Sequence, residues 1–227
     1  MDSKKKIIFL KILIMNKTLL LLIFTPIFLF SQIDDFQGFM DFTYNNDSGK
    51  IILNIEDLDK EFLYINSLSR GVGNNDLGLD RGQLGNSRIV YFTKKGNKIL
   101  LIQPNLRYIS NSLNPLENKA VEEAFARSVL FGFDIIEHSN GSFKVDLTPF
   151  LMKDAHGVAQ RLKSTNSGSY SINKSMSAID LDRTKAFPKN IEFDVLLTFT
   201  GIPSGSLVRS VTPSPSNLTV NQHHSFV

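Results

Sequence analysis

The stretch RGVGNNDLGLDRGQLG at residues 70–85 places five glycines beside amide and carboxylate side chains that could bind a ligand. A phosphate-binding P-loop requires Lys-Ser or Lys-Thr after the glycines, and a dinucleotide site requires a following helix. The sequence has neither, because it runs into a strand-like segment at 89–92. We therefore predict that residues 70–86 form an ordered connection that binds no phosphate, between a strand ending near Ser69 and a strand starting near Ser87.

Calcium is the alternative ligand for this connection. Asn74, Asp76 and Asp80 offer oxygen atoms, which calcium prefers. Their spacing does not match an EF-hand loop, and the closing Glu of that loop is missing. A turn-rich connection is thus the favoured interpretation, and a calcium site stays open as the second one.

The histidines do not form a metal-binding motif. The chain has four: His138, His156, His223 and His224. No H-E-x-x-H motif is present, and zinc sites with thiolate ligands are excluded because the chain has no cysteine. Asp154 and His156 leave an independent hydrolase as the least favoured hypothesis. His223 and His224 would point to opposite faces of a strand, so at most one of them could join a site.

Other arrangements that could perform catalysis are also weak. Ser204 lies in Gly-Ile-Pro-Ser-Gly, but the preceding proline does not suit the strand-to-helix elbow of a serine hydrolase. Two acidic pairs, Glu122 with Glu123 and Asp180 with Asp182, are typical of solvated surfaces. We therefore assign no catalytic, cofactor-binding or metal-binding residue from the sequence.

The N-terminus is typical of an exported protein. Five lysines precede the apolar run 19–30, and Ser31-Gln32 follow it, which predicts a cleaved signal peptide over residues 1–32. Met15 is an alternative start of that signal. The run is too short for a membrane span, which needs about 20 apolar residues. We expect a location in the periplasm, on the cell surface or outside the cell.

Charge excludes a nucleic-acid-binding role. The chain has 25 Lys and Arg against 22 Asp and Glu, but the leader holds five Lys and one Asp. The remainder has 20 basic and 21 acidic residues, so its net charge is near −1. This balance provides no basic patch for nucleic acid. Stability must come from packing, since disulfides are impossible without cysteine.

The patterns predict an α+β fold dominated by antiparallel strands. Turn-forming residues separate three pairs of strand-like segments: 39–44 with 50–55, 88–93 with 98–102, and 133–137 with 142–147. Residues 191–200 predict a long strand with four apolar residues on one face. One clear helix is predicted at about 116–131 and is expected to pack on the sheet. Its signals are a cap at Asn114, a following proline and an apolar stripe that includes Phe125.

The same patterns suggest a division of the chain. Residues 33–201 read as a β-rich domain, and 203–217 are rich in Pro, Ser and Gly, which is typical of a loop. Strand-like residues follow at 218–220 and 225–227. Because the chain ends on such an apolar segment, we expect residues 202–227 to form a connection and the start of a strand whose partners lie in missing sequence.

Several segments together resemble a known family. They are EFLYINSLSRGVGNNDLGLDRGQLGNSRIVYF at 61–92, AVEEAFARSVLFGF at 120–133, VDLTPFLMKDAHGV at 145–158, FPKN at 187–190 and the closing HHSFV. In this order they resemble a domain of unknown function at the N-terminus of bacterial secreted zinc metalloproteases of the met-zincin type.

The resemblance implies a role without a catalytic site in this chain. In that family the H-E-x-x-H motif lies further towards the C-terminus, in a separate domain that would hold the zinc and bind the peptide substrate. The resemblance implies that this chain is a non-catalytic accessory domain, a fragment whose partner is the missing metallopeptidase domain. The alternative is a free-standing exported module that binds a peptide or glycan on a sheet edge.

Overall fold

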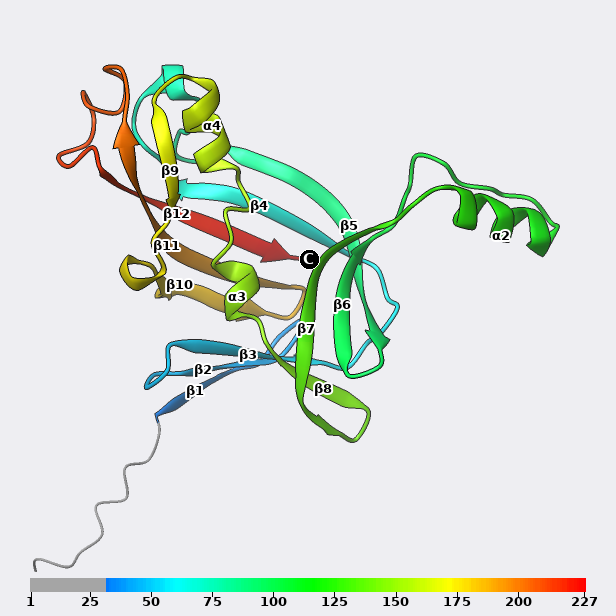
Figure 1. Ribbon diagram of the computed structural model, residues 1–227. Helices are drawn as coiled ribbons and strands as arrows, with labels where there is room; N and C mark the ends of the chain where they lie inside the picture. The colour runs from blue at the N-terminus through cyan, green and yellow to red at the C-terminus, as the bar shows by residue number, and fades with distance from the viewer. Residues whose placement is uncertain (1–31) are drawn as a thin grey trace, which may run out of the picture. The chain divides into compact units, whose positions relative to one another are not determined.

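The computed structural model describes residues 32–227, which form one compact unit (Figure 1). The predicted signal peptide lies almost entirely outside the described residues. No helix within residues 32–227 is long and apolar enough to cross a membrane.

Twelve strands make up one antiparallel sheet, which confirms the β-dominated fold. Eleven lie in the order β1-β2-β3-β8-β7-β6-β5-β4-β12-β11-β10, and β9 pairs with β11. Their bounds are β1 Ile33–Phe36, β2 Phe42–Asn45, β3 Lys50–Ile55, β4 Phe62–Arg70, β5 Leu84–Lys95, β6 Lys98–Gln103, β7 Ser128–Ser139, β8 Ser142–Asp146, β9 Gly168–Ile172, β10 Ala178–Phe187, β11 Asn190–Pro203 and β12 Asn217–Phe226.

The sheet encloses a single apolar core. The two ends of the strand order approach each other. The backbone N–H of Phe39, just before β2, donates to the carbonyl of Phe187 in β10 at 2.8 Å. Phe42 of β2 packs against Phe193 of β11 with ring centres 4.8 Å apart, and both side chains are buried. The helical elements are short: η1 Asn75–Leu77, α2 Pro115–Ala124, α3 Thr148–Leu151, α4 Val158–Ser164 and η2 Lys174–Met176.

The three predicted hairpins are confirmed. β2 pairs with β3, β5 with β6, and β7 with β8, all antiparallel. At the last of these turns Asn140 and Gly141 both have positive φ, at 49° and 84°, as the two central residues of a type I′ hairpin turn require. Local turn chemistry was sufficient to predict these pairs.

The predicted helix begins where expected but ends early. Asn114 caps it, because the Asn114 Oδ1 atom accepts from the Leu116 N–H at 3.0 Å. The helix stops at Ala124, and β7 begins at Ser128, which pairs with Gln103 of β6. Val129, Phe131 and Phe133 are apolar at every second position, as in a strand. Pairing with the edge of β6 therefore makes these residues a strand rather than a continuation of the helix.

The expected packing of this helix on the sheet is wrong. None of the α2 residues is buried, and Phe125 is 37% exposed. The helix lies on an extension, residues 104–127, that connects β6 with β7 and projects from the sheet in Figure 1. We call this extension the arm.

The end of the chain belongs to the same sheet as the rest. The boundary expected after residue 201 falls within β11. β12 pairs with β11 along residues 217–226 and with β4 along residues 221–226. Val227 exchanges two backbone hydrogen bonds with Leu63, each 2.9 Å long. The terminal strand therefore has its pairing partners within this chain, in contrast to the sequence-based expectation.

The glycine-rich connection is ordered, as predicted. It runs from the end of β4 at Arg70 to the start of β5 at Leu84 and contains η1. Leu77 and Leu79 are fully buried and anchor it to the core. Gly78 has a φ of 61°, so the turn after η1 uses a conformation that favours glycine.

Candidate functional site

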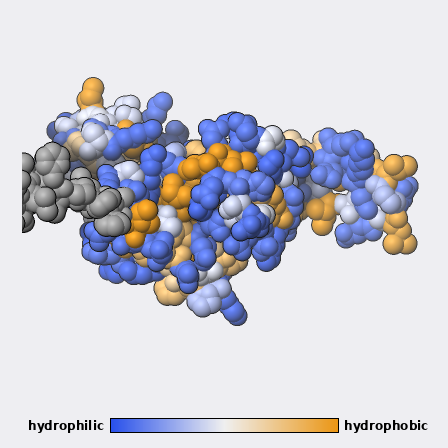
Figure 2. Space-filling view, turned by 90° about the horizontal axis from the view of Figure 1, so that it is seen from below, coloured by the Kyte–Doolittle hydropathy of each residue, from blue (hydrophilic) through white to orange (hydrophobic). Residues whose placement is uncertain are grey.

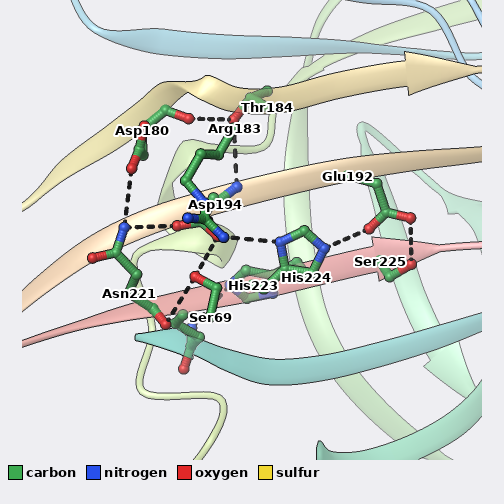
Figure 3. A network of polar contacts seen from close by, with 11 residues as sticks. Ser69, Asp180, Arg183, Thr184, Glu192, Asp194, Asn221, His223, His224 and Ser225 are labelled. Carbon is green, nitrogen blue, oxygen red and sulfur yellow. Dashed lines mark hydrogen bonds and ion pairs between the residues drawn. The ribbon is translucent and has the colours of Figure 1, made fainter. Parts of the chain in front are cut away.

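A network of charged and polar side chains lies on the sheet face opposite the core (Figure 3). Along β11 the side chains alternate: Phe193, Val195 and Leu197 point into the core, so Glu192 and Asp194 point the other way. Neighbouring strands add further polar groups to this face. The network has nine members: Ser69, Asp180, Arg183, Thr184, Glu192, Asp194, Asn221, His223 and Ser225. His224 is also labelled in Figure 3, but its side chain contacts none of them.

His223 of β12 bridges two carboxylates of β11. Its Nε2 atom lies 2.7 Å from the Glu192 Oε2 atom, and its Nδ1 atom lies 3.3 Å from the Asp194 Oδ2 atom. Burial lowers the pKa of the imidazole, but the hydrogen bonds and charges of Asp194 and Glu192 outweigh burial and raise the pKa to about 9. The side chain is therefore a cation at neutral pH.

Asp194 is a fully buried carboxylate with several donors. Asn221 Nδ2 donates to it at 2.8 Å, the Ser69 hydroxyl donates to it, and Arg183 Nε lies 3.4 Å away. Burial raises the pKa of this carboxyl, yet the hydrogen bonds from His223, Ser69 and Asn221 and the charge of Arg183 shift it below its usual value. Asp194 is thus held as an anion inside the protein.

The flanks of the network are also connected. Ser225 donates to Glu192 at 2.8 Å, and burial of Glu192 is outweighed by hydrogen bonds that lower its pKa. Asn221 Nδ2 also donates to Asp180 at 3.0 Å. The network therefore connects β4, β10, β11 and β12 through side chains.

The geometry of the network does not match a nucleophile with its base. The hydroxyl of Ser69 donates to Asp194, whereas a catalytic serine donates to a neutral histidine. The nearby imidazole of His223 already carries a second proton, because its two carboxylate partners stabilise the protonated form. It therefore cannot accept a further proton at neutral pH. The arrangement acts instead as an electrostatic bridge across neighbouring strands.

His224 lies on the opposite face, as the sequence predicted for adjacent histidines in a strand. Its Nδ1 atom is 2.9 Å from the Tyr64 hydroxyl, and its Nε2 atom lies 2.9 Å from Gln222 Nε2 and 3.1 Å from the Leu151 carbonyl. Complete burial lowers the pKa of His224 to about 3. This histidine is a neutral, hydrogen-bonded core residue.

Asp154 and His156, the candidates for an independent hydrolase, have structural contacts. Both carboxylate oxygens of Asp154 accept backbone N–H groups at the start of α4, from Val158 at 2.7 Å and Ala159 at 2.9 Å. The His156 backbone N–H donates to Gln222, and burial lowers the pKa of its half-buried ring. These contacts bring no nucleophile to the pair.

The remaining candidates lie apart from the network, with the exception of Asp180. Glu122 and Glu123 form exposed ion pairs with Arg127 and Lys119, in agreement with a solvated face. Ser204 is an exposed loop residue.

The calcium candidates are partly occupied by local contacts. Asn74 Oδ1 accepts the Asp76 N–H at 3.0 Å and thereby caps η1. Within residues 32–227, no group of three or more His, Cys, Asp or Glu side chains is arranged to hold a metal ion.

The central residues of the network were missed by sequence reasoning. Glu192, Asp194, Arg183 and Ser69 were not selected from the sequence. The available signal was the IEFDV segment, in which two acids alternate with apolar residues that belong to the core. Such acids on one face of a long apolar strand indicate a polar cluster, but their partners lie on other strands.

Fold and network together define a mostly β domain with an electrostatic cluster on its outer sheet face and a projecting arm. The chain belongs to the family of a domain of unknown function, DUF5117, whose profile matches residues 82–227. Comparisons with curated proteins and with solved structures gave no match. The matched region contains the arm and most of the network.

Proposed function

We propose that this chain is a non-catalytic N-terminal accessory domain of a secreted bacterial zinc-dependent metallopeptidase. In this proposal it docks on the metallopeptidase domain and helps to form or cover the substrate cleft. The resemblance of residues 61–92 and of later segments to such proteins motivates the proposal. The observation that carries it is the arm.

The arm exposes apolar side chains that the core does not use. Six side chains on it are between 37% and 102% exposed: Leu106, Tyr108, Ile109, Leu113, Leu116 and Phe125. Figure 2 shows apolar surface at the far end of the arm, on the right of the view. Exposed apolar groups gathered on one element are typical of an interaction surface, because burying them releases about 25 cal/mol per Å².

The arm has internal order that suits docking. The rings of Tyr108 and Phe125 stack with centres 4.0 Å apart, which fixes one side of α2 against the preceding segment. Arg127 contacts both Glu122 and the Tyr91 hydroxyl at the base of the arm. An extension that is already ordered loses less conformational entropy on binding than a flexible one.

In this proposal the chemistry belongs to the metallopeptidase domain. Zinc held there by two histidines on one helix would polarise the peptide carbonyl and activate water. This chain would contribute a docking surface and no metal ligand. Its place of action would be the periplasm, the cell surface or the extracellular medium.

The first test is the DNA downstream of the codon for Val227. An in-frame H-E-x-x-H motif is expected, and the encoded metallopeptidase domain should form a complex with this chain in analytical ultracentrifugation. Replacing Leu113 and Leu116 with serine should weaken the complex. The control is Ile202→Ser, which removes a 79% exposed apolar residue outside the arm.

Two outcomes would reject the proposal. A reading frame without the motif would favour the free-standing module that binds a peptide or glycan. A complex of unchanged affinity with both arm residues replaced would show that the arm is not the docking surface.

A further inference from the structure

One border of the sheet is open along part of β5. Residues 84–90 of β5 pair with β4, and residues 91–95 pair with β6. Within residues 32–227, no strand pairs with the other side of 84–90. Figure 1 shows β5 at the border of the part of the sheet that continues through β4 and β12. Every second residue of this segment therefore directs its backbone N–H and C=O groups to an unoccupied side.

A groove of about 440 Å³ follows this open border. Ser87, Arg88 and Ile89 of β5 form one side of it, and the base of the arm, including Leu106 and Arg107, lines the rest. Residues 87–90 of β5 pair regularly with β4 on one side. On their other side the groove has room for an extended chain of a few residues.

The groove is positively charged. Among residues 32–227, Arg88 and Arg107 are the only charged residues that line it. The Arg88 guanidinium carbon lies 5.9 Å from the centre of the Tyr64 ring, and that of Arg107 lies 5.7 Å from the Tyr108 ring. Aromatic contacts restrict both side chains while leaving their N–H donors for a carboxylate, which arginine binds in a bidentate manner.

We propose that the open border of β5 binds an extended peptide segment that carries Asp or Glu side chains. The segment adds to the sheet as a further antiparallel or parallel strand, and its backbone hydrogen bonds supply most of the affinity. Arg88 and Arg107 select the acidic side chains. This site is separate from the proposed docking through the far end of the arm and does not depend on it.

A second copy of the chain fits this border less well than an acidic peptide. Symmetrical pairing of two β5 edges would bring together two grooves whose lining, within the described part of the chain, contains arginines and no acids. Like charges that face each other across paired strands are destabilising. The charge of the groove thus favours a partner of opposite sign.

The experiment uses the ¹⁵N-labelled chain without its leader and follows backbone amide signals by NMR. The probe is a capped heptapeptide of alternating Val and Glu. One control peptide has Lys in place of Glu, and a second has N-methylated backbone nitrogens, which cannot donate to a strand. We expect shifts centred on residues 84–90 with the Val-Glu peptide and much smaller shifts with both controls.

Variants separate the role of charge from that of the fold. Arg107→Gln should weaken binding of the Val-Glu peptide about two- to fivefold, the effect of one exposed ion pair. The matched control is Lys119→Gln, which removes one positive charge from exposed α2 and should leave binding unchanged. Equal binding of the Lys peptide or of the N-methylated peptide would overturn the proposal. So would shifts that lie outside β5 and the base of the arm, or no shift at about 1 mM peptide.

Discussion

Replacing His223 with glutamine should change how the stability of the fold depends on pH. The imidazole lies between Glu192 and Asp194, and its pKa is raised from 6.5 to about 9. A group that binds its proton more tightly in the folded state stabilises that state below its unfolded pKa. The contribution of His223 is therefore complete below pH 6.5 and is lost as the pH rises towards 9.

The magnitude follows from the size of this shift. One pKa unit corresponds to about 1.4 kcal/mol, so a rise from 6.5 to about 9 corresponds to at most about 3 kcal/mol. The side chain is 27% exposed, and solvent screening reduces the value to about 1–2 kcal/mol. The free energy of unfolding should fall by this amount between pH 6 and pH 9.

Neighbouring titratable groups act outside this pH window. The lowered pKa values of Glu192 and Asp194 mean that their contributions are present above their unfolded values and are lost only as the pH falls through their folded values. His224, with a pKa lowered to about 3, also reduces stability only as the pH falls from 6.5 towards 3. The decline between pH 6.5 and 9 thus reports on His223.

The assay is urea denaturation at a series of pH values between 6 and 9. The wild-type free energy of unfolding should decline over this range, and that of His223→Gln should be nearly constant. The matched control is His138→Gln, which removes a histidine that stacks on Phe143 in another part of the sheet. If His223→Gln keeps the wild-type slope, the bridge between the two carboxylates does not hold the proton and the reasoning fails.

Other substitutions test the packing, the arm and the glycine-rich connection. Phe193→Ala should lower the free energy of unfolding by about 3–5 kcal/mol, because the side chain is fully buried. Phe125→Ala should lower it clearly less, because that ring is 37% exposed. Equal shifts of the urea midpoint would contradict this. Asn114→Ala removes the cap of α2 and should destabilise the helix by about 1 kcal/mol, seen as faster hydrogen exchange in the arm with unchanged exchange in β11. Calcium should leave the melting temperature of the wild type unchanged; a rise that Asp76→Ala abolishes would show that the connection binds the ion. The purified chain should bind less than one equivalent of zinc, and near-stoichiometric zinc with chelator-sensitive proteolysis would contradict the proposed non-catalytic role.

Local sequence determined the hairpins, the start of the helix and the faces of the strands. The turn at Asn140-Gly141 and the cap at Asn114 depend on residues within a few positions of each other, so their physics can be read from the sequence. Alternation in a strand likewise placed His223 and His224 on opposite faces before any partner was known.

Tertiary structure decided which segments became neighbours. Residues 128–131 satisfy both a helical stripe and strand alternation, and pairing with β6 selected the strand. The terminal strand β12 pairs with β4 and β11. Its partners in β4 are distant in sequence: His224 lies opposite Asn66, more than 150 residues earlier in the chain. The polar network depends on the same long-range pairing, because Ser69, Asp194 and His223 come from three strands. A carboxylate such as Asp194 can be buried only when distant segments supply its donors, and those partners are determined by the register of the sheet rather than by local sequence.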